Sequence, residues 1–151
     1  MQAKEANVLK LHLSLPVADL AATEAFYATL FNAPPSKSKG DYLKFEPDEL
    51  ALNISFTPAG VEKSPETNRH LGIQFPSQED LDLEYERLSA ANLVHGIRES
   101  SICCYANQDK FWVSDPDGYR WELYYLVSDS DVRIEMGTGC CATESERSHC
   151  C

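Results

Sequence analysis

The sequence is short of basic residues. Lys and Arg number 13 against 24 Asp and Glu, which gives a formal net charge of −11 and a pI near 4.7. Binding to nucleic-acid phosphates requires clustered Lys and Arg, and no basic patch is visible. We therefore expect no nucleic-acid partner.

The chain also lacks a long apolar run. No uninterrupted apolar stretch approaches the roughly 20 residues that span a bilayer. The first seven residues show neither the basic start nor the apolar run of a signal peptide. We therefore expect a cytoplasmic protein with no membrane partner, and its 151 residues fit one compact domain.

Cysteines spaced for ordinary disulfides are lacking too. All six cysteines fall in three adjacent pairs: Cys103-Cys104, Cys140-Cys141 and Cys150-Cys151. Neighbouring Cβ atoms diverge, which disfavours a disulfide, and a structural zinc site would prefer a two-residue spacer. In a cytoplasmic chain we interpret these thiols first as ligands or reactive groups. Two buried small hydrophobes, a strained vicinal disulfide or half of a zinc site remain alternatives for Cys103 and Cys104.

What is present is a repeated order of strand and helix patterns. Residues 8–17 alternate in apolar character, as in a half-buried strand, and His12 falls away from the aliphatic side. Asp19 can cap a following helix, and Ser77 has capping-box spacing before a second helix. The other strand candidates are 41–45, 51–57, 70–75, 94–98, 110–114 and 119–126.

This order predicts an α+β fold of two βαβββ modules in tandem. Module 1 spans about 8–57 and module 2 about 69–127, within one domain at 8–128. Residues 57–68 form the expected linker, because they contain two prolines and a glycine. Residues 130–151 lack apolar periodicity, which predicts a flexible, Cys-rich tail.

Three residues are candidate metal ligands. His12 opens the first module and His70 the second, so a pseudo-twofold repeat would place them at equivalent positions. Glu122 has the less apolar parity of the final strand. Two imidazoles and one carboxylate suit a non-heme Fe(II) site with open positions. Spacing alone leaves two alternatives open, because the histidines could be hydrogen-bonded surface residues and Lys110 or Arg120 could simply pair with Glu122.

Four stretches resemble the vicinal oxygen chelate superfamily of glyoxalases, bleomycin-resistance proteins and extradiol dioxygenases: 11–20, 25–27, 68–73 and 115–123. The resemblance implies that the paired βαβββ modules form a cupped mixed sheet, the vicinal oxygen chelate fold. It also implies that His12, His70 and Glu122 hold a divalent metal in the cup formed by the two sheets. Glyoxalases typically add a fourth ligand from the last strand of the first module. Here that strand, 51–57, contains no His, Glu or Asp, which favours three ligands and the oxygenases. A glyoxalase-type lyase stays an alternative.

The segment at 101–113, which contains Cys103-Cys104-Tyr105, resembles the substrate-binding segment of the bacterial carbon-arsenic lyases, sometimes described as cadmium-induced proteins. The resemblance implies an Fe(II)-dependent, O₂-using enzyme that cleaves trivalent methyl or aryl arsenicals to arsenite, for detoxification. Cys103 and Cys104 would be its catalytic, substrate-binding thiols. Trivalent arsenic is soft and has two exchangeable positions in a monoorganic species, so two neighbouring thiolates can hold it bidentately.

Three further side chains are expected in the substrate pocket: Tyr105, Lys110 and Tyr124. The tail cysteine pairs could deliver arsenicals, scavenge the arsenite product or bind Cd(II). A non-catalytic arsenic- or cadmium-binding protein is the alternative function, and a homodimer is left open as the assembly.

Overall fold

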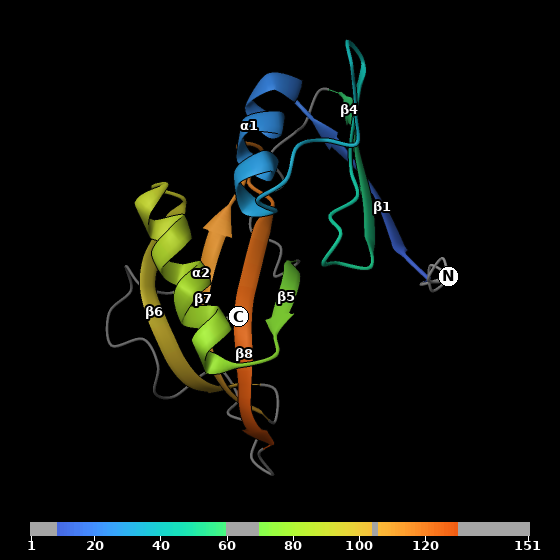
Figure 1. Cartoon of the computed structure of the whole chain (residues 1–151). Helices are drawn as coiled ribbons and strands as arrows, with labels where there is room; N and C mark the ends of the chain where they lie inside the picture. The colour runs from blue at the N-terminus through green and yellow to red at the C-terminus, as the bar shows by residue number, and fades with distance from the viewer. Residues whose placement is uncertain (1–8, 60–69, 104–105, 130–151) are drawn as a thin grey trace. The chain divides into compact units, whose positions relative to one another are not determined.

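The computed structural model describes residues 9–59, 70–103 and 106–129 (Figure 1). It divides into two compact units. Unit 1 contains the chain up to Lys63 together with Asp115–Asp117, and unit 2 contains Ser64–Ser114 and the chain from Gly118 onward. The tail predicted at 130–151 and most of the predicted linker lie outside the described residues.

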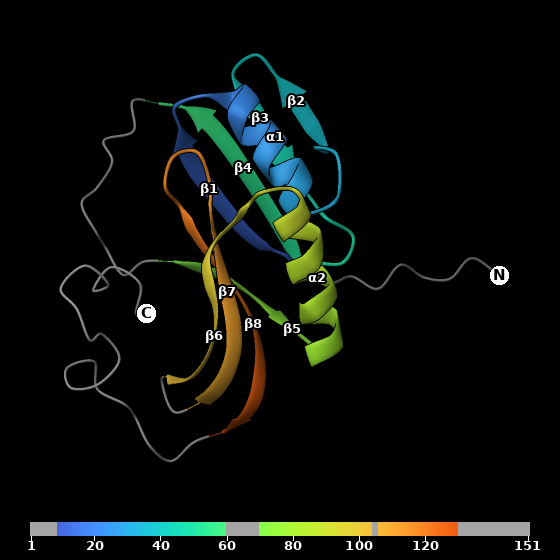
Figure 2. The same ribbon diagram turned by 90° about the vertical axis from the view of Figure 1, so that its left-hand side faces the viewer.

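Unit 1 has the order β1 (Leu11–Val17), α1 (Leu20–Leu30), β2 (Lys37–Lys39), β3 (Tyr42–Phe45) and β4 (Leu52–Pro58). The strands form one sheet in the order β1-β4-β3-β2, in which β1 and β4 are parallel and the other pairs antiparallel (Figure 2). Asp19 caps α1 as predicted, since its Oδ1 accepts hydrogen bonds from the backbone N–H groups of Ala21 and Ala22.

The core of unit 1 is aromatic. Tyr27 of α1 is fully buried, and its ring lies 4.4 Å from the ring of Phe56 on β4. On β1, Leu15 pairs in register with Phe56 and therefore shares its face of the sheet. His12 has the opposite parity, which confirms that it faces away from the aliphatic side.

A turn from late in the chain belongs to unit 1. Asp115 is buried and accepts a hydrogen bond from the hydroxyl of Tyr27 at 2.9 Å. Asp117 accepts one from the backbone N–H of Ala18, also at 2.9 Å. Gly118 closes the turn with a φ of 91°, a value that its lack of a Cβ permits. The attachment of this turn to α1 was not expected from the sequence.

Unit 2 repeats the same plan with β5 (Leu71–Phe75), α2 (Gln78–Ala90), β6 (Val94–Cys103), β7 (Ala106–Ser114) and β8 (Arg120–Asp129). Its sheet has the order β5-β8-β7-β6, again with one parallel pair, β5 with β8. Each unit is thus one βαβββ module, and the predicted α+β fold is confirmed. None of the helices in the described ranges is long and apolar enough to cross a membrane.

Two parts of the sheets differ from the prediction. The short strand β2 was not expected, because all three of its side chains are exposed and show no alternation. Strands β6 and β7 run further than 94–98 and 110–114. Cys103 lies beyond the strand predicted at 94–98, but it is the last residue of β6 and pairs with Ala106. The added segments are mostly polar and show no regular apolar alternation, so backbone pairing holds them.

Candidate functional site

The site in unit 2 lies on the side of the sheet away from α2. On β7, Phe111 faces α2, where its ring lies 5.1 Å from that of Tyr85. Alternation along the strand places Lys110 and Trp112 on the opposite side, which we call the polar face of unit 2. The β8 residues paired in register with these two share this face: Tyr124 and Glu122.

Glu122 is the centre of this face. Its Oε1 lies 3.0 Å from the Nζ atom of Lys110, and its Oε2 lies 3.3 Å from the Nε2 atom of His70. The Lys110 side chain is only 2% exposed and that of Glu122 12% exposed. A buried ammonium group needs a counter-charge nearby, and Glu122 supplies it. The carboxylate therefore has one oxygen beside a cation and the other beside an imidazole.

The His70–Glu122 pair fits two ligands of one divalent metal. Ligand nitrogen and oxygen atoms lie about 2.1 Å from such ions, so two at right angles are about 3 Å apart. The observed separation of 3.3 Å is close to that value. Lys110 engages the other oxygen, which leaves Oε2 of Glu122 as the atom that faces His70. The pairing of Lys110 with Glu122 that the sequence left open is therefore present.

Trp112 borders this pair and was not expected from the sequence. It is 6% exposed, with the imidazole of His70 edge-on at 5.1 Å between ring centroids. The Arg120 guanidinium stacks on its ring at 4.2 Å, and Lys110 lies 5.5 Å from the ring centroid. Within the described part of the chain, the buried indole N–H has no hydrogen-bond partner. Alternating parity could have placed Trp112 and Arg120 beside Glu122, had the register been known.

Tyr124 follows Glu122 by two residues on β8, so both side chains lie on the polar face. Its register partner on β7 is Lys110, and its hydroxyl donates to Oε1 of Gln74 on β5 at 3.3 Å. Tyr124 and Lys110 thus lie next to Glu122 on the polar face. Their contact with a substrate stays a prediction.

His12 belongs to unit 1. It is exposed, and its Nδ1 lies 3.3 Å from Oδ1 of Asn53. An Nδ1–H that donates to Asn53 leaves the lone pair of Nε2 available for a ligand. Among the residues with described positions, no group of three or more His, Cys, Asp or Glu side chains is gathered as a metal site. The set of His12 with His70 and Glu122 therefore stays a prediction.

The thiol segment begins at the end of the same sheet. Cys103 ends β6 opposite Ala106, while Cys104 and Tyr105 lie outside the described residues. Ala106 is six positions before Trp112 on β7, which is about 20 Å along a flat strand. The sheet is not flat, because Figure 2 shows the ends of β6, β7 and β8 curving away from α2. The end of β6, which is Cys103, therefore bends towards the side of the sheet opposite α2.

The two βαβββ modules define the fold class of the chain. Comparison of the sequence with known families assigns it to a superfamily. Residues 11–123 match the Glyoxalase/Bleomycin resistance protein/Dioxygenase superfamily. The chain belongs to this superfamily, which confirms the resemblance found in the sequence.

Relatives within the superfamily are more specific. The chain is 35% identical to a probable trivalent organoarsenical cleaving enzyme of Bacillus subtilis, with 87% of this chain and 90% of that protein covered. It is 34% identical to a trivalent organoarsenical cleaving enzyme of a Bacillus species, over 93% and 88% of the two chains. It is also 35% identical to the cadmium-induced protein CadI of Mycobacterium bovis, over 94% and 92%.

Solved structures share the fold. A glyoxalase/bleomycin resistance protein/dioxygenase from Alicyclobacillus acidocaldarius matches with a TM-score of 0.67 at 18% identity, over 79% of this chain and 92% of that one. A variant of the fosfomycin resistance protein FosX from Listeria monocytogenes matches with a TM-score of 0.58 at 25% identity, over 75% and 86%. That FosX variant is complexed with Mn(II) and a dihydroxypropylphosphonic acid.

Proposed function

We propose that this chain is an enzyme that cleaves trivalent organoarsenicals, with a methyl or an aryl substituent, to arsenite. One combination carries the proposal: the adjacent cysteines start at the end of a strand in the same sheet as the His70–Glu122 pair. Relatives that are 31 to 35% identical over most of the chain are named organoarsenical cleaving enzymes, which supports this substrate class. The proposed setting is cytoplasmic detoxification.

In this proposal Cys103 and Cys104 capture the substrate. The two thiolates replace the two exchangeable ligands of the trivalent arsenic atom. The carbon substituent stays bound as the third group. Bidentate capture restricts where that substituent can point, and this restriction lowers the entropic part of the barrier. The proposal places the captured group on the polar face of unit 2.

The proposed metal ligands are His12, His70 and Glu122. Fe(II) held by these groups would supply the activation of O₂ that breaking a carbon–arsenic bond requires. Lys110 fixes the Glu122 carboxylate by its contact with Oε1, so that Oε2 stays directed at His70. Tyr105 and Tyr124 are proposed to contact the captured arsenical together with Lys110.

The test is arsenite release from a trivalent phenylarsenical by the full chain loaded with Fe(II). We expect release in air, none after removal of O₂, and release slowed by about 10²-fold or more from Fe(II)-loaded Cys103→Ser protein. Full turnover under strict anaerobiosis would show that the reaction does not use O₂. Turnover at the wild-type rate by the Cys103→Ser variant would remove the thiol pair from the mechanism.

A second candidate function has one observation in its favour, the relatives named cadmium-induced proteins. In this alternative the thiol pairs sequester arsenic or Cd(II) without catalysis. The same experiment separates the two functions, because a binding protein retains the arsenical in stoichiometric amounts and releases no arsenite.

A further inference from the structure

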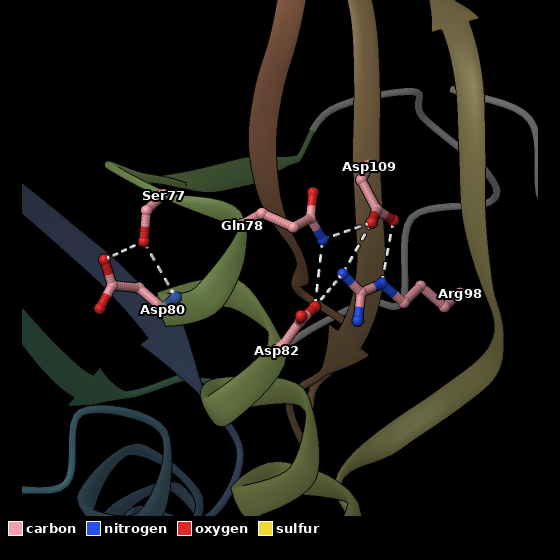
Figure 3. Close-up of polar contacts among 6 residues, drawn as sticks. All are labelled: Ser77, Gln78, Asp80, Asp82, Arg98 and Asp109. Atoms are coloured by element: carbon pink, nitrogen blue, oxygen red, sulfur yellow. Dashed lines mark hydrogen bonds and ion pairs between the residues drawn. The ribbon is translucent and has the colours of Figure 1, made fainter.

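A cluster of four polar side chains joins β6, β7 and α2 on the side of the sheet opposite the polar face (Figure 3). Arg98 of β6 is at its centre. Its Nε donates to Oδ1 of Asp109 at 2.9 Å, and its Nη2 donates to Oδ2 of Asp109 at 2.7 Å and to Oδ1 of Asp82 at 2.5 Å. Gln78 donates to Asp109 at 2.6 Å and to Asp82 at 3.1 Å. We call these four residues the Arg98 cluster.

The cluster is held more firmly than an isolated surface pair. The two-pronged contact of a guanidinium with a carboxylate fixes direction as well as distance. The Arg98 side chain is 24% exposed, and its guanidinium also lies 5.5 Å from the ring centroid of Tyr85 on α2. Hydrogen bonding by Asp109 raises the pKa of Arg98 above its ordinary value, and hydrogen bonding by Gln78 and then Arg98 lowers the pKa of Asp82.

The cluster lies where the pairing of β6 with β7 is interrupted. His95 pairs with Trp112 and Glu99 with Lys110, so Gly96–Arg98 on β6 stand opposite the single residue Phe111. Gly96 has a φ of 85°, which a glycine tolerates. Extra residues in one strand break the ladder and bend the sheet. Among the strands that the structure describes, β6 lies at the edge of its sheet and has β7 as its one neighbour at this break.

The bend decides where Cys103 lies. Cys103 is five residues beyond Arg98, about 17 Å along the strand. Over that length, a change of about 5° in the bend moves the end of β6 by about 1.5 Å. A misplacement of about 1 Å can lower a rate by about 10²-fold. A contact that fixes the angle of the bend therefore also fixes the position of Cys103 at the end of β6.

We propose that Arg98 is a positioning residue: by fastening the break in β6 to Asp109 of β7 and to Asp82 of α2, it sets the curve that carries Cys103 towards the His70–Glu122 pair. Arg98 lies on the other side of the sheet from that pair and acts only through the backbone. The inference rests on the proposed function for its meaning in catalysis, but the position of the thiols can be measured without turnover.

The chain offers a matched control in Arg87. Its guanidinium makes the same two-pronged contact with Glu84, through Nε at 2.9 Å and Nη2 at 2.5 Å, and its side chain is 31% exposed. Both residues lie on α2, three positions apart. Replacing Arg87 by Met thus removes a comparable ion pair without touching β6.

The experiment uses the full chain with the four tail cysteines changed to serine, which leaves Cys103 and Cys104 as the remaining thiols of the six. In this background, Arg98→Met is compared with Arg87→Met. Mn(II) is bound at the metal site, and a trivalent 4-fluorophenylarsenical at the thiols. Fluorine NMR then reports their separation through paramagnetic broadening, while kcat, KM and the arsenical affinity are measured with Fe(II)-loaded protein.

We expect Arg98→Met to lose most of the broadening and to lower kcat by about 10²-fold. Its affinities for Mn(II) and for the arsenical should stay within about threefold of the parent, since both sets of ligands remain. Arg87→Met should match the parent in every measurement. Equal broadening and equal kcat in the two variants would overturn the proposal, as would a parallel loss of Mn(II) binding in Arg98→Met.

Asp82→Asn tests the same contact if Arg98→Met fails to fold. It weakens only the link to α2 and leaves the contact between Arg98 and Asp109, so a smaller loss of broadening and of kcat is expected. Values equal to those of Arg87→Met would refute the role of that link. Absence of broadening already in the parent would instead show that the thiols do not lie near the metal, and the proposed function would fail together with the inference.

Discussion

At the scale of single residues, the Glu122 carboxylate determines the electrostatics of the polar face. It neutralises the buried Lys110 ammonium and at the same time faces His70. A divalent metal bound by His70 and Glu122 would be separated from the Lys110 ammonium only by the Glu122 carboxylate. The metal ion and the Lys110 ammonium repel each other. Lys110 therefore stabilises the metal-free protein more than the metal-bound protein.

This arrangement predicts the effect of Lys110→Met. The substitution leaves a largely buried carboxylate without its ammonium partner, and we expect the metal-free protein to lose about 3 kcal/mol of unfolding free energy. A bound divalent cation would replace the missing charge, so Mn(II) should stabilise the variant more than the wild type. Urea unfolding with and without Mn(II) measures both effects. Lys39→Met, at an exposed position of β2, is the control. Equal stabilisation by Mn(II) in all three proteins would contradict this view of the site.

The proposed ligands are tested by metal content. His12→Ala, His70→Ala and Glu122→Ala should each purify with little iron, because each removes one of three ligands. His95→Ala and His149→Ala should retain iron. His95 makes the sharper control, since it is paired in register with Trp112 and stands beside the same face. Similar iron content in all five variants would reject the triad, whatever the activity.

At the scale of elements, the hydrogen bond of Tyr27 to Asp115 fastens the Asp115–Asp117 turn to α1. Tyr27→Phe removes the hydroxyl that donates to the buried Asp115 carboxylate. Hydrogen bonds to charged groups contribute about 1.5 to 3 kcal/mol, so a loss in that range is expected. Tyr42→Phe, at a half-buried position of the same unit, should change stability by less than about 0.5 kcal/mol. Thermal melts of the two variants provide the comparison, and identical midpoints would show that the turn is not fastened through Tyr27.

The sequence predicted elements where an apolar pattern exists and missed them where it does not. The caps Asp19 and Ser77 were sufficient to place the start of both helices, and the strand candidates gave the order of both modules. The end of β6 was missed because its residues are polar. The Arg98 cluster could not be predicted either, because it depends on a break in register that brings Arg98 beside Asp109.

The residues of the candidate site also differ in whether the sequence could predict their positions. Parity of the last strand was enough to predict that Glu122 stands apart from the apolar side, and the structure gives it His70 and Lys110 as neighbours. Trp112 was not predicted, because its position depends on which residue of β7 pairs with Glu122. Local pattern gives the face of a strand, whereas cross-strand register determines which side chains meet.

At the scale of the whole molecule, the two modules are equivalent in topology but not in ligands. Glu122 pairs with Gly72, two positions after His70. The corresponding residue two positions after His12 is Ser14, and it pairs with Ser55. Ser55 is therefore the counterpart of Glu122 in module 1, and its hydroxyl donates to the backbone carbonyl of Leu13. The repeat thus offers two histidines but one carboxylate, which favours three protein ligands over four.

The last prediction concerns the division of labour among the three thiol pairs of the chain. The tail pairs supply no proposed metal ligand, so changing all four tail cysteines to serine should leave the melt unchanged and arsenite release detectable. Truncation after Asp129 should give the same result, because the removed segment has no apolar periodicity. A truncated chain that loses its cooperative melt would show that the tail is part of the folded domain.

In the four-serine background, replacing Cys103 or Cys104 by serine should leave Fe(II) content unchanged and abolish bidentate capture. A hydroxyl is a harder ligand than a thiol and ionises far less readily, so it does not replace the lost thiolate near neutral pH. The remaining thiol holds the arsenical at one point, and the carbon substituent can then swing away from the metal. We expect turnover to fall by about 10²-fold or more. Arsenical titration, iron analysis and arsenite release on the same preparations separate loss of capture from loss of metal. Tight binding with normal turnover in either single variant would assign the capture of substrate to other groups on the chain.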